Sequence, residues 1–105
     1  MKILLAVALF FAGTVNVQAL NRWVTIINDT GYTMVTFQAS NRDQTSWGGD
    51  WFGPNIVLYS GEQIDINLDD GSGYCVWDLK ATFSDGDEVT RMGLNVCEVG
   101  SWRVY

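Results

Sequence analysis

The sequence predicts an all-β protein: a small antiparallel β-sandwich of six or seven strands with one disulfide, after an N-terminal signal peptide. Short runs rich in β-branched and aromatic residues alternate with Gly, Asp, Asn and Ser clusters, spaced about eight to twelve residues apart. No segment after residue 19 keeps the 3.6-residue period of an amphipathic helix. A small β-barrel is the alternative architecture for this pattern.

The first 19 residues have the layout of a secretory signal peptide. Lys2 precedes an apolar run from Ile3 to Gly13, and Val17-Gln18-Ala19 places small residues before a cleavage site. The run is shorter than the about 20 residues that a transmembrane helix needs. We therefore expect cleavage after Ala19, a secreted or periplasmic product, no membrane insertion, and a single β-sandwich domain over residues 20–105.

Three strands are expected in the first part of this domain, at residues 22–28, 32–39 and 56–59. The first (RWVTIIN) is rich in β-branched residues and ends at a turn sequence whose Asn28-Asp29-Thr30 is also a glycosylation sequon, relevant only in a eukaryotic source. In the second, alternation places Val35 with Phe37 on one face and Met34 with Thr36 on the other. The third (IVLY) follows a long polar loop, residues 40–55.

The remaining strands are expected at residues 62–68, 74–83, 88–95 and 102–105. The first two alternate most clearly, and their inward positions are Ile64, Ile66, Leu68, Cys75, Trp77, Leu79, Ala81 and Phe83. Residues 69–73 between them are predicted to form a hairpin loop, and residues 84–87 a tight turn.

Cys75 and Cys97 are predicted to form a structural disulfide. They are the two cysteines of the chain, and export would place them in an oxidising compartment. A redox or metal pair is the rival interpretation, but the cysteines lie far apart in sequence and the chain contains no histidine. In the chain-entropy model a bridge over this separation stabilises a small domain by about 3 kcal/mol.

Composition argues against several classes of function. After removal of Lys2 with the signal peptide, five basic residues face twelve acidic ones, and this net charge of −7 disfavours nucleic acid and anionic membranes as partners. The absence of histidine excludes Ser-His-Asp and Cys-His catalysis, and no phosphate-binding glycine motif occurs. We expect no enzyme and no cofactor.

Acidic residues in two turns are weak candidates for calcium binding: Asp69, Asp70, Asp85, Asp87 and Glu88. The stretch from Asp65 to Val76 fails as an EF-hand loop, because its sixth residue is not glycine and its twelfth is not glutamate. The two turns should leave opposite ends of one long strand, so their acids should not converge. No metal site is expected, and turn formation explains these acids equally well.

The loop SNRDQTSWGGDWFGPN (residues 40–55) contains the candidate binding residues Trp47, Asp50, Trp51 and Phe52. A loop of this length in a compact domain is usually functional or tethered. Displayed aromatic side chains would form a platform for a sugar or a protein. Alternatively the aromatic side chains fold inward and supply core area; we favour tethering of Trp47 and expect Trp51 to be the more exposed.

Five short motifs occur in a fixed order: Trp47-Gly48-x-Asp50-x-Phe52-Gly53, Ser60-Gly61-Glu62, Cys75-x-Trp77-Asp78-Leu79, Asp85-Gly86 and Asn95-x-Cys97-Glu98. This set resembles a family of small, exported, mostly bacterial proteins, although Ser60 stands where that family has proline. The resemblance implies a disulfide-linked β-domain of uncharacterised function. It also implies that Trp47 helps to specify the fold and that Asp78 orders the chain by accepting backbone donors.

The leading hypothesis is a non-enzymatic secreted or periplasmic binding module that acts on a protein partner. Its contact surface would combine the acidic face with the exposed part of residues 41–52, so a basic partner suits the charge. The alternative is a carbohydrate- or calcium-dependent ligand-binding domain that uses Trp51, Phe52 and nearby acids. A small hydrolase with paired carboxylates is the third hypothesis. The oligomeric state is left open.

Overall fold

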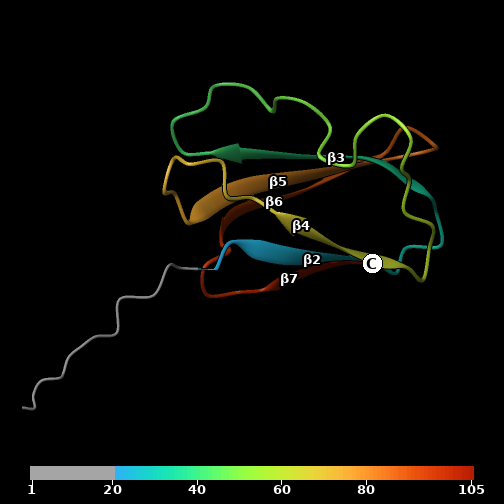
Figure 1. Cartoon of the computed structure of the whole chain (residues 1–105). Coiled ribbons are helices and arrows are strands. Elements are labelled where there is room, and N and C mark those ends of the chain that lie inside the picture. The colour runs from blue at the N-terminus through green and yellow to red at the C-terminus, as the bar shows by residue number, and fades with distance from the viewer. Residues whose placement is uncertain (1–20) are drawn as a thin grey trace, which may run out of the picture.

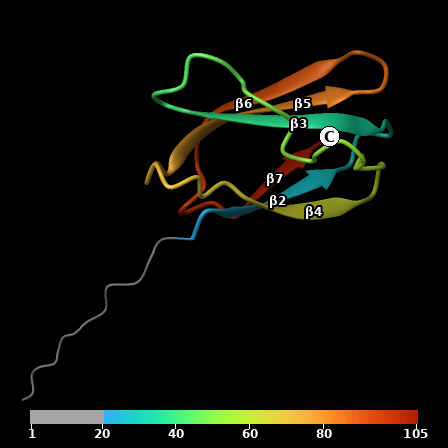
Figure 2. The same cartoon turned by 45° about the horizontal axis from the view of Figure 1, so that its top comes forward.

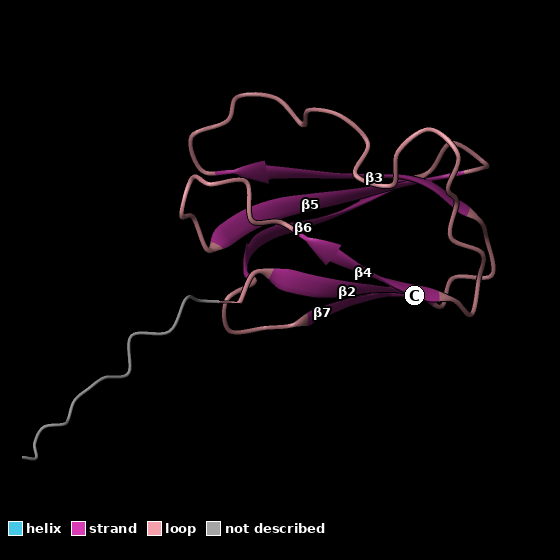
Figure 3. Ribbon diagram, viewed as in Figure 1, coloured by secondary structure: helices cyan, strands magenta, loops and turns pink. Residues whose placement is uncertain are grey.

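The computed structural model describes residues 21–105, and the predicted signal peptide lies outside this range. The described chain contains strands and loops and no helix (Figure 3). The strands are β2 (Trp23–Asn28), β3 (Met34–Asn41), β4 (Gln63–Asn67), β5 (Val76–Phe83), β6 (Glu88–Asn95) and β7 (Ser101–Val104).

The strands form two three-stranded sheets that pack face to face, so the predicted sandwich is confirmed. One sheet has the order β4-β2-β7 and the other β3-β5-β6, and the two layers are seen one above the other in Figures 1 and 2. All neighbouring pairs are antiparallel except β2 and β7, which are parallel. Parallel pairing is available to β7 because it arrives from the other sheet rather than through a hairpin.

Side chains from both sheets meet in one hydrophobic core. The alternation predicted for residues 77–83 is confirmed, because Trp77, Leu79, Ala81 and Phe83 are all buried. The two layers are bridged by aromatic contact, for example between the rings of Phe37 on β3 and Trp102 on β7, whose centroids lie 6.4 Å apart. Burial of such apolar area is the main stabilising term for a small sandwich.

The predicted faces of β3 are wrong at its beginning. Met34 and Phe37 are both fully buried, whereas Val35, expected to share a face with Phe37, is half-buried. The cause is a register irregularity between Met34 and Thr36 in the pairing with β5. An extra residue in one strand of a pair shifts the alternation by one position, and the sequence pattern alone does not mark where this happens.

Two local predictions are corrected by the way the chain changes sheets. Residues 56–59 do not form a strand; only Leu58 pairs there, in an isolated bridge to Met34. Residues 69–73 are not a hairpin loop, because β4 pairs with β2 in one sheet and β5 with β3 and β6 in the other. Two alternating strands joined by a turn have the sequence pattern of a hairpin. The pattern is the same when each strand pairs with a different neighbour.

The predicted disulfide is confirmed. Cys75 immediately precedes β5 and Cys97 follows β6, with an S–S distance of 2.05 Å and a Cα–Cα distance of 5.3 Å. Next to it, the Val96 N–H donates a hydrogen bond to the Cys75 carbonyl at 2.9 Å. The bridge therefore closes the open end of the β5–β6 pair.

Asp78 orders the chain by accepting a backbone donor, as the resemblance implied. Its Oδ1 accepts the N–H of Gly93 at 2.8 Å. This contact lies where the β5–β6 register shifts, between Trp77 and Leu79. A carboxylate that accepts a backbone donor compensates for the ladder bond that such an irregularity removes.

Candidate binding site

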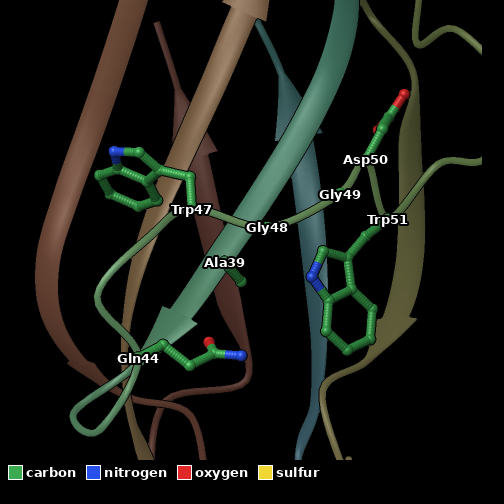
Figure 4. Close-up of a pocket in the computed structure, with 7 residues that line it drawn as sticks. All are labelled: Ala39, Gln44, Trp47, Gly48, Gly49, Asp50 and Trp51. Carbon is green, nitrogen blue, oxygen red and sulfur yellow. The ribbon is translucent and has the colours of Figure 1, made fainter.

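The long loop after β3 returns across that strand and holds itself in place. We call residues 42–51 the strap. Figure 4 shows Gly48 and Gly49 crossing β3, with Trp47 on one side of the strand and Trp51 on the other. The Gln38 side chain, on the outer face of β3, donates from Nε2 to the Gly48 carbonyl at 2.8 Å. Gly48 has φ +70°, a left-handed conformation that side chains rarely adopt.

Asp50 fastens the returning end of the strap to the edge of β3. Its Oδ1 accepts two backbone donors, the N–H of Phe37 at 3.0 Å and the N–H of Phe52 at 2.9 Å. The Trp51 N–H donates to the Phe37 carbonyl at 2.7 Å. In Figure 4 the Asp50 carboxylate points away from the Trp51 indole. Asp50, a candidate binding residue, therefore has a structural role that the sequence did not predict.

The start of the strap is held by the end of β3 and by a neighbouring loop. Asn41 exchanges two hydrogen bonds with Gln44: its N–H donates to Oε1 at 2.9 Å, and its carbonyl accepts the Gln44 N–H at 3.1 Å. The Tyr74 hydroxyl donates to the Asp43 carboxylate. This hydrogen bond, with the adjacent negative charge, raises the pKa of Tyr74 above its ordinary value.

Trp47 is half-buried on the outer face of the sheet. The Lys80 ammonium group lies 5.1 Å from the centroid of its ring, within the range of a cation–π contact. Lys80 Nζ also lies 3.9 Å from a Glu88 carboxylate oxygen. The residue as a whole is partly accessible. Trp47 is therefore tethered, as favoured, and is also partly accessible to solvent.

The aromatic residues at the other end of the strap turn towards the core. Phe52 is only 4% exposed and stacks on Phe37, with ring centroids 6.0 Å apart. Phe52 therefore follows the alternative in which the ring folds inward and supplies core area. Trp51, expected to be the more exposed tryptophan, packs edge-on against Trp77 at 6.2 Å and stays half-buried. These rings enlarge the small core, because the burial of aromatic side chains removes much apolar area from water.

An open pocket of about 420 Å³ lies under the strap. Its lining, drawn in Figure 4, comprises Ala39, Gln44, Trp47, Gly48, Gly49, Asp50 and Trp51. A smaller hollow of about 190 Å³ shares Gln44 and Trp47 with it and adds Asp78 and small polar residues. Sequence reasoning missed Ala39 and Gln44, because a small strand residue and a loop amide carry no chemical signal by themselves.

The turn acids do not gather into a metal site. Asp69 and Asp70 precede β5 and Asp85, Asp87 and Glu88 follow it, so the two groups lie at opposite ends of that strand. Within residues 21–105 no three acidic, cysteine or histidine side chains come together as metal ligands would. Asp70 Oδ1 accepts the Ser72 N–H at 3.0 Å, and the Ser72 hydroxyl in particular lowers the pKa of that carboxyl.

Within residues 21–105 there is no helix long and apolar enough to cross a membrane. In comparisons with known proteins, no family model, no curated protein and no solved structure matches this chain. The resemblance to the small exported disulfide-linked family stays a prediction. The function of this chain must therefore be inferred from the geometry of the strap and its pocket.

Proposed function

We propose that this chain is a non-enzymatic, secreted or periplasmic binding module for a protein partner, and that the strap pocket is its contact site. The observation that carries the proposal is that Trp47 and Trp51 both line one open pocket. Tryptophan is the residue most often found to carry binding energy at protein interfaces, particularly inside a pocket.

The strap supports this role because it is already ordered. Its returning end is fastened by Asp50, its crossing by Gln38, and its start by Gln44. A binding loop that is held in one conformation loses little conformational entropy when a partner arrives. Trp47 and Trp51 are both only partly buried despite these contacts.

Charge favours a basic partner. The exported chain would carry a net charge of −7, and Asp50 and Asp78 contribute to the walls of the two adjoining hollows. Complementary charge raises the rate of association and disfavours acidic competitors. We therefore expect partner binding to weaken as salt concentration rises.

A carbohydrate ligand is the second candidate. It is favoured by the combination of two accessible indoles with the Gln44 amide in one pocket. Aromatic rings stack on the apolar faces of sugars, and amides pair with their hydroxyl groups. Calcium dependence of such binding has less support, because the turn acids lie outside this pocket.

The test uses oxidised residues 20–105 immobilised and exposed to the exported-protein fraction of the source cell. Wild-type protein is compared with Trp47→Ala and with the control Trp23→Ala, which removes a 52% exposed tryptophan from β2 in the other sheet. A protein retained by the wild type and Trp23→Ala but lost with Trp47→Ala supports the proposal. Equal retention by all three chains rules out the strap pocket as the contact site.

A further inference from the structure

The edge of β3 that faces away from β5 is almost completely hydrogen-bonded to the chain's own loops. β3 is an edge strand whose inner neighbour is β5. On its other side, Met34 exchanges backbone hydrogen bonds with Leu58, both at 2.9 Å. Farther along, Phe37 is paired by Asp50 and Trp51, and Asn41 by Gln44. Covering an edge in this way prevents unwanted strand pairing.

Ala39 is the exception along this edge. Backbone groups alternate along a strand, so the N–H and C=O of Ala39 point to the same side as those of Phe37 and Asn41, towards the strap. Within residues 21–105 the strap bonds fall on those two neighbours and none falls on Ala39. Ala39 is 3% exposed and lines the pocket.

This gap indicates an occupant for the pocket. Nearly all buried backbone N–H and C=O groups in proteins have hydrogen-bond partners. At Ala39 a donor and an acceptor lie together on the edge of β3 that faces away from β5, beside the pocket that Ala39 lines and on the side of the strand where Trp51 lies. Water can satisfy such groups in an open pocket, and a ligand that replaces it there presents an acceptor and a donor side by side.

We propose that the pocket binds one extended residue of a peptide, whose N–H and C=O exchange hydrogen bonds with Ala39. This inference rests on the proposed function and specifies which part of the partner is recognised. In an extended residue the N–H and C=O point to the same side, so two opposed residues exchange both bonds. A single trans amide, such as the acetamido group of an amino sugar, points its N–H and C=O in opposite directions and satisfies one of the two.

The neighbouring contacts limit the length of the bound segment. Asp50 and Trp51 already occupy the edge at Phe37, and Gln44 occupies it at Asn41. A long strand therefore has no free edge to follow. The occupant is a loop tip or a chain end that brings a single extended residue to Ala39, on the side of β3 where the Trp51 indole lies.

The first experiment follows backbone amide and indole signals by NMR during titration with N-acetyl-leucine methylamide, the smallest probe with one complete peptide residue. We expect a saturable shift of the Ala39 amide, and at least about five-fold weaker binding of the analogue methylated on the leucine nitrogen, because one hydrogen bond is lost. An unresponsive Ala39 amide, equal binding of the two probes, or tighter binding of N-acetylglucosamine would overturn the inference.

The second experiment uses Ala39→Pro in the partner-capture assay. Proline removes the N–H that faces the strap and leaves the β3–β5 ladder intact, because that N–H points away from β5. Ala39→Gly, which keeps the N–H, is the matched control. We expect at least about five-fold weaker capture by the proline variant alone.

The two proposals fail in different ways. If Trp47→Ala loses the partner while Ala39→Pro keeps it, the strap pocket is the contact site but the main-chain pairing is wrong. If Trp47→Ala keeps the partner, the proposed function itself fails. Should Ala39→Pro not fold, the paired probes on the wild-type protein still decide the question.

Discussion

Replacing Asp50 by alanine should loosen the strap and destabilise the whole domain. The carboxylate accepts two backbone N–H groups, those of Phe37 and Phe52, at 3.0 and 2.9 Å. A net contribution of about 1.5 kcal/mol for each charged hydrogen bond gives a loss of about 3 kcal/mol for Asp50→Ala. Asp50→Asn keeps an acceptor oxygen but loses the charge, and about half of this loss is expected.

The assay is urea unfolding of the oxidised protein, with the midpoint and the slope of the transition measured for each variant. Asp85→Ala is the matched control, because Asp85 accepts one backbone N–H, that of Asp87, inside an exposed turn. It should cost less than about 1 kcal/mol. Equal destabilisation by Asp50→Ala and Asp85→Ala would refute the view that Asp50 fastens the strap.

Three further outcomes are expected. Reduction of the Cys75–Cys97 bridge should lower the free energy of unfolding by about 3 kcal/mol, measured by urea unfolding with and without reductant; an unchanged midpoint would contradict the chain-entropy argument. Phe52→Ala should cost about 3–5 kcal/mol because the ring is buried on Phe37, and a thermal melt within a few degrees of wild type would show that this ring does not complete the core. Tyr74 should ionise at a pH above its ordinary pKa of 10.0, because its hydroxyl donates to Asp43. This hydrogen bond stabilises the fold below pH 10, and the stabilisation is lost as the pH rises through the raised pKa. Ultraviolet titration should therefore show that Tyr74 ionises at a lower pH in Asp43→Asn than in the wild type.

Much of the fold was predictable because it depends on short-range pattern. The alternation in residues 77–83 marks a strand with one buried face, and that strand is the centre of its sheet. The Cys75–Cys97 bridge follows from the cysteine count and the predicted export signal, and its separation is compatible with a closed loop. Asp78 was expected to order the chain, and it accepts a backbone donor from Gly93.

The sequence predicts which loop carries the candidate site but not how the side chains of that loop are arranged. Residues 40–55 and both tryptophans were singled out from loop length and composition. Their orientation depends on contacts with residues distant in sequence, such as Trp51 with Trp77 and Trp47 with Lys80. Phe52 looks like a ligand-binding residue by type but is buried on Phe37.

The all-β class, the period of the strands and the pairing of the cysteines could be predicted from the chain alone, because they follow from residue type and spacing. Only the tertiary structure decided which strands share a sheet, where the bulge in β3 reverses the faces, and which edge the strap covers. The gap at Ala39 belongs to this second group. Pairing partners and free edges are properties of segments brought together by folding, and alternation is the same for a strand whatever lies beside it.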